Sequence, residues 1–302
     1  MIDILTRAGG FVAIIVLGYV LKRVGVFKQE DFPVLSRLLM RVTFPASIIV
    51  SFAQREMDPS MLVLALVAIG CGVCYMLIAW LINLRGSNEQ KAFDILNLPG
   101  YNIGNFTMPF VQSFLGPMGI IATSIFDVGN AVIVLGGAFG IASTVKSGAK
   151  FSVKRIVKAL GKSVPFITYL VMMSLNLLRV PIPKPVTDLA GTIGSANAFL
   201  AMFVIGVGFR ISGDRAQLGK ILRHLAIRYS VAAVFATVFW FVLPFPLEVR
   251  QALVILAFSP IGSAVPPFTG ELGGDVGLSS AINSVAILCS VVINVVLLGV
   301  IM

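Results

Sequence analysis

The chain has 302 residues, of which 58% are hydrophobic and 12% are charged, and its mean hydropathy is +0.99. Soluble domains carry about 25% charged residues, so the composition excludes an ordinary cytosolic enzyme, a nucleic-acid-binding protein and a disulfide-stapled secreted domain. The net charge of +10 does not indicate an acidic partner, because basic residues of membrane proteins gather in cytoplasmic loops. The composition indicates a polytopic α-helical membrane protein.

Apolar runs bounded by charges, proline or glycine predict ten membrane-spanning helices. A span needs about 20 apolar residues to cross a hydrocarbon core of about 30 Å. In chain order the runs cover residues 8–26, 34–53, 61–82, 92–115, 118–144, 163–180, 187–209, 221–243, 249–270 and 277–301. The first run lacks the cleavage site of a signal peptide, so we expect it to be a retained span. The lipid bilayer is the expected surrounding of all ten.

Lysine and arginine are distributed unevenly between the two sides of the predicted membrane protein. The connections after spans one, three, five, seven and nine hold sixteen basic residues, against five at the termini and in the other connections. The positive-inside rule places the richer group in the cytoplasm and both termini outside an inner (plasma) membrane. We interpret residues 145–162, the longest basic stretch, as a cytoplasmic linker between a first half, 1–144, and a second half, 163–302.

The two halves share a repeated element. A shift of 158 residues aligns residues 103–105 (Ile-Gly-Asn) with 261–263 (Ile-Gly-Ser), and residues 108–110 with 266–268. Each copy lies in the fourth span of a five-span half. Because five is odd, the second half must be inserted upside down relative to the first. The sequence therefore predicts two inverted five-helix repeats, an arrangement that recurs among secondary transporters.

Both copies of the repeated element carry residues that break a helix at mid-span. Residues 98–109 contain two prolines, two glycines and two asparagines, and residues 259–267 contain three prolines. Proline removes a backbone donor and clashes with the preceding turn. In lipid, the freed carbonyls must line a polar cavity or pack within protein. Matching breaks therefore predict a substrate site where spans four and nine cross, with break positions at Gly104, Pro109, Gly262, Pro266 and Pro267.

The chemistry of the breaks predicts the kind of ligand. Pro109 and Pro267 suit the first residues of the second half-helices, where a missing N–H costs little. The free N–H groups and positive dipole ends of these half-helices would then meet near the midplane and attract an anion. We expect a small carboxylate as the ligand. The neutral donors expected around it are Asn102, Asn105, Thr107, Ser259 and Ser263.

Asp127 is the acidic residue that lies deep within a predicted span, whereas the other twelve lie in loops or at span ends. An aspartate at bilayer depth costs about 2.5–3.5 kcal/mol on insertion scales, so it normally faces a cavity and carries function. No lysine or arginine at comparable depth is evident as a partner. We expect Asp127, with Asn130 on the same face, to face the crossover and to exchange a proton. The alternative is an aspartate that only joins spans four and five.

The stretch Asn102–Pro109, the Pro45-Ala46 step and the five-plus-five layout resemble the auxin efflux carrier family over nearly the whole chain. The resemblance implies broken helices four and nine that cross and pack against a scaffold domain. It also implies a fold similar to that of bile-acid sodium symporters and an elevator-like movement. The family includes plant auxin carriers and bacterial transporters that are proposed to move dicarboxylates such as malonate, malate or oxalate. The short linker favours a bacterial-type carrier with a substrate other than auxin.

The resemblance also implies which positions line the site. Polar residues of span five lie beside the crossover, and span two faces the same cavity through two serines spaced four apart on one helical face. The positions that carry over are Asn105, Pro109, Pro266, Pro267, Asp127, Asn130, Ser47 and Ser51. We interpret three other intramembrane asparagines, Asn197, Asn283 and Asn294, as structural.

The favoured function is a secondary carrier of small mono- or dicarboxylates, and three alternatives stand beside it. A sodium-coupled anion symporter is one, although scarce mid-membrane carboxylates favour a proton over sodium as the coupling ion. A passive anion channel is another, but paired breaks favour a binding site. An intramembrane enzyme is disfavoured, because His224 lies at a span end and Cys71-x-x-Cys74 lies within a helix. We expect no cofactor, metal or nucleic acid, and leave a homodimer open.

Overall fold

The computed structural model describes residues 2–209 and 217–302, and these residues form helices without any strand. Helices occupy all ten apolar runs of the sequence, and five of these runs are divided into two α-helices each. Up to the basic linker the helices are α1 (Ile2–Arg23), α2 (Phe32–Leu38), α3 (Phe44–Gln54), α4 (Val63–Ile82), α5 (Asn88–Asn97), α6 (Met108–Phe114), α7 (Pro117–Val132) and α8 (Ala138–Ser147). Short 3-10 or π-helical turns join several of them.

The second part of the chain is built in the same way. Its helices are α9 (Val153–Leu160), α10 (Val164–Leu177), α11 (Lys184–Gly194), α12 (Asn197–Gly208), α13 (Leu218–Phe241), α14 (Leu247–Ala257), α15 (Val265–Glu271) and α16 (Val276–Ile301). The basic linker is thus partly helical, because α9 lies inside it. Arg210 and Arg215, two basic residues of the seventh connection, lie outside the described residues.

Six stretches of the described residues are long and apolar enough to cross a membrane by length and composition. They are Gln29–Gln54, Pro59–Ile82, Pro117–Ser147, Lys184–Gly208, Leu218–Phe241 and Val276–Ile301. The pair α9 and α10, bent by 77°, would make a seventh if it counts as one span. The all-helical membrane class is therefore confirmed, while the count of ten spans in two inverted repeats stays a prediction.

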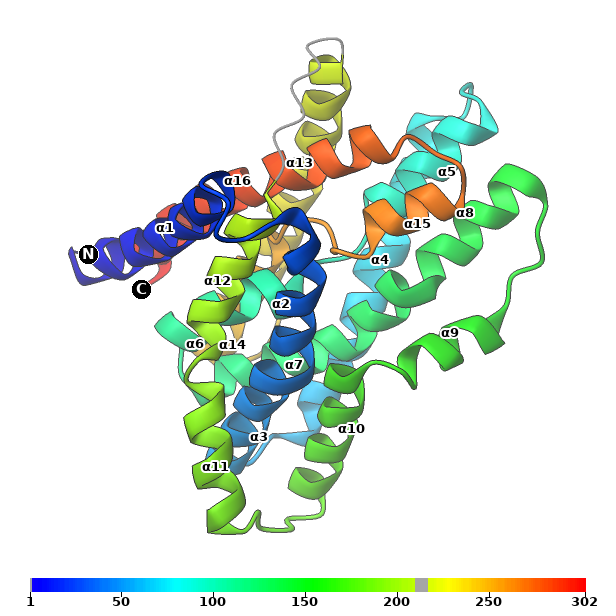
Figure 1. The fold of residues 1–302 in the computed structure, drawn as a ribbon. Helices are drawn as coiled ribbons and strands as arrows, with labels where there is room; N and C mark the ends of the chain where they lie inside the picture. Colours follow the sequence, from blue (N-terminus) through cyan, green and yellow to red (C-terminus); the bar gives the residue numbers. More distant parts are fainter. Residues whose placement is uncertain (1, 210–216) are drawn as a thin grey trace.

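The helices pack around the centre of the molecule. α1 lies against α12 and α16, so that the two chain ends are close together (Figure 1). α3 packs against α10 and α11 at the opposite end of the molecule, and α4 and α14 both pack against α7. α14 is buried along nearly its whole length. Of the short helices of the ninth run, α14 is therefore enclosed, whereas α15 has only Val265 and Thr269 buried.

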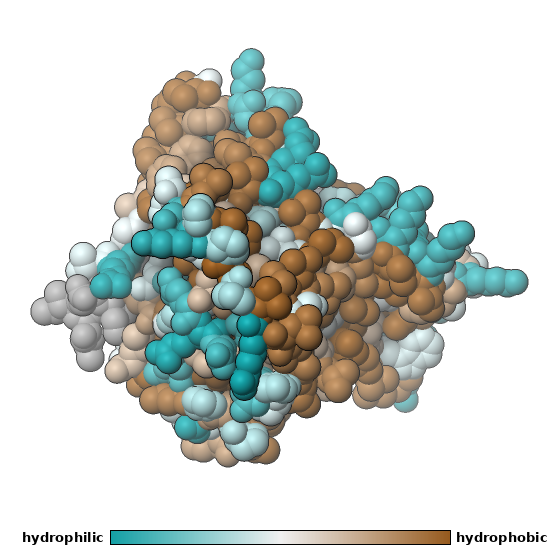
Figure 2. Space-filling view, turned by 90° about the horizontal axis from the view of Figure 1, so that it is seen from below, coloured by the Kyte–Doolittle hydropathy of each residue, from teal (hydrophilic) through white to brown (hydrophobic). Residues whose placement is uncertain are grey.

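The outer surface carries many large apolar side chains. Leu66 on α4 is 67% exposed, Phe241 on α13 is 78% exposed and Val300 on α16 is 77% exposed. Figure 2 shows hydrophobic residues spread over broad areas of the face that it presents. A monomeric soluble protein rarely exposes such large apolar patches, so this surface fits contact with lipid.

Candidate functional site

The first break separates α5 from α6. α5 ends at Asn97, the backbone is non-helical over residues 98–102, and helix resumes as the π-helical turn η4 (Ile103–Thr107). Gly100 adopts a φ of 81°, and a Cβ at this position would lie 2.6 Å from Val134 Cγ2. Only glycine adopts this left-handed conformation freely. The turn out of α5 therefore depends on Gly100.

The second half-helix begins before the proline that was expected to open it. Pro109 is the second residue of α6, and η4 precedes it without interruption. A proline in a helix clashes with the carbonyl four residues back. The Met108 N–H bonds to Ile103 O, five residues back, so the chain enters α6 through a wider π-helical turn. Gly104 is therefore helical and lies inside the half-helix instead of at its start.

The second break separates α14 from α15. α14 ends at Ala257, α15 begins at Val265, and the backbone between them, residues 258–264, is non-helical. Pro266 and Pro267 are the second and third residues of α15. Prolines are tolerated in a first turn, because its N–H groups have no helical acceptor. This half-helix therefore begins at Val265, two residues before Pro267, which the sequence predicted as its first residue.

Direct contacts join the two breaks. The backbone N–H of Asn102 donates to the carbonyl of Pro260 at 2.9 Å. The side-chain amide of Asn105 donates from Nδ2 to Ser263 Oγ at 3.0 Å. Asn105 is 8% exposed, whereas Ser263 is exposed. The two chain segments therefore cross at these residues, with Ser263 on the accessible side.

The inner side of the crossing is closely packed. The hydroxyls of Thr107 and Ser259 are hydrogen-bonded to each other, and both residues are fully buried. A Cβ at Gly262 would lie 2.9 Å from Val134 Cγ1, the side chain that Gly100 also faces. The five polar residues predicted around the breaks therefore lie at one crossing, and Gly262 permits their close approach.

Arg228 on α13 lies at the centre of this crossing, and the sequence analysis assigned it no role. Its guanidinium donates to the carbonyl of Leu98 and, at 2.8 Å each, to the carbonyls of Gly100 and Ser259. The residue is 0% exposed. Carbonyls freed by both breaks are therefore satisfied by one cation. The signal in the sequence that could have identified Arg228 is the presence of an arginine inside the apolar run 221–243.

The charge of Arg228 has no acidic partner among the described residues. Its Nε is buried without a hydrogen-bond partner. The rings of Tyr75 and Tyr101 lie 5.5 and 5.4 Å from the guanidinium carbon, within the range of cation–π attraction. The crossing thus holds a positive charge that carbonyl dipoles and aromatic rings stabilise, without a neutralising carboxylate.

Asn130 on α7 contacts the first break, and Asp127 on the same helix lies next to Asn130. Asn130 Oδ1 accepts from the Tyr101 N–H, and its Nδ2 donates to Tyr101 O, each at 2.9 Å. Asn130 Nδ2 also donates to Asp127 Oδ1 at 2.8 Å. The phenol of Tyr169 on α10 donates to Asp127 Oδ2 at 2.9 Å. Asp127 is therefore linked to the break through Asn130, with two neutral donors on its carboxylate.

The two serines of span two do not reach the breaks. Ser51 Oγ donates to Ser47 O within α3, at 2.8 Å. Ser47 Oγ accepts from Gln112 Nε2 at 2.8 Å, and Gln112 Oε1 accepts from Asn197 Nδ2 at 3.0 Å. Thr43 donates to Asn197 Oδ1 at 3.1 Å. α6 is thus joined to α3 and α12 by a partly buried chain of neutral polar groups, of which Gln112 and Thr43 were not predicted.

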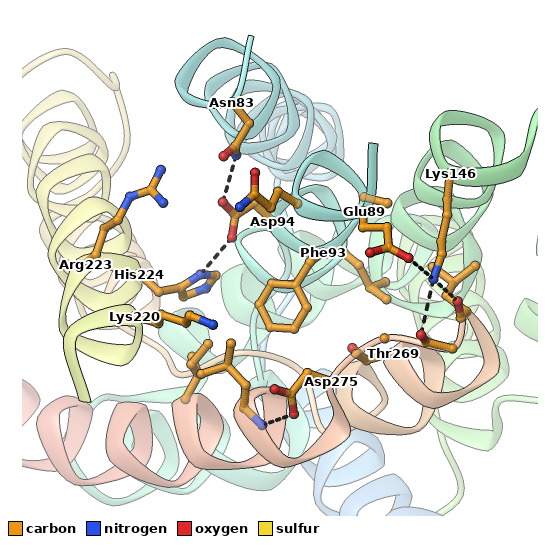
Figure 3. Close-up of a pocket in the computed structure, with 18 of the residues that line it drawn as sticks. Asn83, Glu89, Phe93, Asp94, Lys146, Lys220, Arg223, His224, Thr269 and Asp275 are labelled. Atoms are coloured by element: carbon orange, nitrogen blue, oxygen red, sulfur yellow. Dashed lines mark hydrogen bonds and ion pairs between the residues drawn. The ribbon is translucent and has the colours of Figure 1, made fainter. Parts of the chain in front are cut away.

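A polar cavity of about 360 Å³ lies between α5, α13 and the turn from α15 to α16 (Figure 3). His224, which the sequence places at a span end, is 4% exposed and lines this cavity. Its Nδ1 lies 3.4 Å from Asp94 Oδ1, and Asn83 Nδ2 donates to Asp94 Oδ2 at 2.8 Å. His224 Nε2 lies 3.1 Å from the carbonyl of Asn97. The cavity therefore ends next to the first break.

The described residues hold no cluster of three or more histidine, cysteine or acidic side chains that could bind a metal. The donors at the crossing are neutral amides and hydroxyls around one guanidinium. Amide N–H, hydroxyl and guanidinium groups all donate hydrogen bonds. This arrangement suits the binding of an anion.

Comparison with known proteins agrees with the membrane-exposed surface and the broken helices. Residues 11–301 match the sequence profile of a family described as Membrane transport protein. An uncharacterized transporter of Methanothermobacter thermautotrophicus is 24% identical over 256 residues, which cover 83% of this chain and 79% of that protein. The family match over residues 11–301 includes both breaks and the whole of α13. The chain belongs to this family of membrane transport proteins, the auxin efflux carrier family.

Proposed function

We propose that this transporter is a secondary carrier of small organic anions, mono- or dicarboxylates, that bind where η4 and α6 cross the α14–α15 break. The observation that carries the proposal is the buried guanidinium of Arg228, which has no carboxylate partner among the described residues. A buried charge is costly unless it is paired. A bound carboxylate near the crossing offsets that cost without a protein acid at the site.

The accessible side of the crossing offers the donors for such an anion. Ser263 is exposed, and Asn105 beside it has a buried Oδ1 without a hydrogen-bond partner. A carboxylate that accepts from Asn105 Nδ2 and from the Ser263 hydroxyl would replace their mutual hydrogen bond. Both donors are neutral, so the positive charge behind them is the main attraction for the anion.

The inverted-repeat architecture is part of the proposal. Asn105 and Ser263 are separated by 158 residues, which is the shift that aligns the two halves, and they hydrogen-bond to each other. Equivalent residues of two repeats meet in this way where they lie next to the axis that relates the repeats. This contact supports two inverted five-helix repeats, 1–144 and 163–302, joined by the linker 145–162.

An elevator movement fits the contacts around the crossing, which among the described residues are hydrogen bonds and not ion pairs. α6 is joined to α3 and α12 through Gln112, and α7 is joined to α10 through Asp127 and Tyr169. Such hydrogen bonds can be exchanged for bonds to water at a net cost of about 0.5–3 kcal/mol each. We assign α3, α10 and α12 to the scaffold and the broken helices to the moving unit, with Asp127 as the proton-exchanging group.

The proposed orientation places the basic connections in the cytoplasm and both termini outside. Three of the predicted cytoplasmic connections contribute to one cavity: Asn83 with Glu89, Lys146, and Gly273 with Asp275 line it together. Their position around a common cavity supports the assignment of these connections to one side of the membrane.

The test is a thermal-shift screen of the purified protein against mono- and dicarboxylates and against their neutral amides, at constant ionic strength. A ligand that prefers the folded state raises its apparent stability. We expect carboxylates to raise the melting temperature and the amides not to do so. Carboxylates that bind are then tested for counterflow in liposomes, which a carrier supports and a passive channel does not. Stabilisation by amides and acids alike would contradict the anion site.

A further inference from the structure

The C-termini of α5 and α14 lie close together in the crossing, next to the guanidinium of Arg228. α5 ends at Asn97 and α14 ends at Ala257, and the carbonyls of Leu98, Gly100 and Ser259 follow directly after these ends. The last carbonyls of a helix lack helical partners and carry partial negative charge. In transporters with discontinuous helices, such ends and unwound carbonyls coordinate Na⁺ or H⁺. The crossing therefore has the carbonyl arrangement of a cation site.

The guanidinium of Arg228 fills this arrangement. One terminal nitrogen donates to Leu98 O and the other donates to the carbonyls of Gly100 and Ser259. One turn earlier on the same buried face of α13, His224 Nε2 lies 3.1 Å from the carbonyl of Asn97. An arginine keeps its charge at any physiological pH. The position is therefore occupied permanently by a covalently attached cation.

Several contacts hold the side chain in place. The rings of Tyr75 and Tyr101 lie 5.5 and 5.4 Å from its guanidinium carbon. The Tyr75 hydroxyl donates to the backbone carbonyl of Arg228 at 3.0 Å, which links α4 to α13 at this level. A second cation among the same carbonyls would meet the repulsion of the guanidinium at close range.

We propose that Arg228 is a tethered cation that takes the place of a sodium ion in the crossing, so that this carrier holds its broken helices together and binds its anion without Na⁺. The claim that the anion binds without Na⁺ rests on the proposed function. The claim that Arg228 occupies the cation site does not rest on it. The anion is attracted by a charge that belongs to the protein. The proposal therefore predicts that transport by this chain is not coupled to sodium.

The first experiment measures the melting temperature of the full-length protein without any substrate, at constant ionic strength. For the wild type we expect the same value in sodium, potassium and choline chloride. Arg228→Ala exposes the three carbonyls, so its melting temperature falls, and millimolar guanidinium or Na⁺ restores part of the loss. Choline is too large to enter and should not restore it. Because no substrate is present, this result stands or falls independently of the proposed function.

Two further variants keep the test decisive. Arg223→Ala removes an exposed arginine of the same helix and should show no specific response to guanidinium. Arg228→Lys keeps a tethered charge, so its melting temperature should not depend on Na⁺. This variant provides the test if Arg228→Ala does not fold. Higher wild-type stability in Na⁺ than in choline would overturn the proposal. An equal response of Arg228→Ala to guanidinium and choline would also overturn it.

The second experiment measures anion affinity with the carboxylate found by the screen. Replacing choline by Na⁺ should leave the wild-type affinity unchanged. Arg228→Ala should lose about tenfold or more, the loss expected for a charged hydrogen-bonding group, and should recover part of it in Na⁺. A wild-type affinity that rises with Na⁺ would show that a separate sodium ion binds, contrary to the proposal.

Discussion

Tyr169 on α10 donates its phenolic hydrogen to Asp127 on α7, with 2.9 Å between the two oxygens. The other carboxylate oxygen of Asp127 accepts from Asn130, which holds both backbone groups of Tyr101 in the first break. One carboxylate therefore connects the break to a helix on the far side of α7. A change in its protonation would alter the link to Tyr169 and the link to the break together.

Asp127→Asn is predicted to retain substrate binding and to lose the pH dependence of net uptake into liposomes. The amide imitates the protonated acid but has no proton to release across the transport cycle. Uptake is measured over a series of external pH values at constant membrane potential. Tyr169→Phe serves as the control, because it removes one donor and keeps the carboxylate, so a pH dependence should persist. A wild-type pH profile in Asp127→Asn would reduce Asp127 to a structural link.

Two buried asparagines provide a matched test of how much the hydrogen bonds from Asn130 to Tyr101 stabilise the first break. Asn130 is 3% exposed and satisfies the N–H and C=O of Tyr101, whereas Asn294 is 0% exposed and neither of its amide atoms has a partner. Asn130→Leu should destabilise the protein by about 1–3 kcal/mol for each group of Tyr101 left unpaired. Asn294→Leu should be neutral or stabilising, because it removes an unpaired buried polar group.

Both leucine variants are compared with the wild type by their melting temperatures in the same detergent. The prediction requires a clear order, with Asn130→Leu well below the wild type and Asn294→Leu at or above it. If Asn294→Leu were as damaging as Asn130→Leu, Asn294 would be bonded to a lipid or a ligand.

The breaks could be predicted from the sequence because proline and glycine act locally. Gly100 turns the chain at a φ of 81°, and Pro266 and Pro267 lie in the first turn of α15. The onset of the first half-helix could not be predicted in this way. A π-helical turn at Ile103–Thr107 precedes Pro109, and periodicity alone cannot separate such a turn from an irregular segment.

The role of Arg228 could not be predicted, because its acceptors are remote in sequence. The carbonyls of Leu98 and Gly100 lie 130 and 128 residues away, and that of Ser259 lies 31 residues away. An apolar run predicts a membrane-spanning helix, but it does not predict which helix ends from the two breaks lie next to that helix. The same reason applies to Gln112, whose partners Ser47 and Asn197 lie on two other helices.

The predicted orientation is tested by cysteine labelling in a background without Cys71, Cys74 and Cys289. Lys150→Cys lies in the exposed linker between α8 and α9, and Glu56→Cys lies in the exposed connection after α3. The positive-inside rule predicts that Lys150→Cys reacts with an impermeant maleimide only from the cytoplasm. Glu56→Cys should react only from outside. Labelling of both positions from the same side would contradict the proposed topology.

The final prediction concerns Asn105 and Ser263, the hydrogen-bonded pair that occupies equivalent positions in the two halves. If a carboxylate takes a donor from each, Asn105→Ala and Ser263→Ala should each weaken binding by about 0.5–1.5 kcal/mol, up to about tenfold in affinity. The double variant should lose more affinity than either single variant, although the two losses need not add, because the residues contact each other. If the two residues only bond to each other, affinity should stay unchanged, each single variant should lower the melting temperature, and the double variant should lower it no further. Affinity and melting temperature measured on the same four proteins separate an anion site from a structural contact.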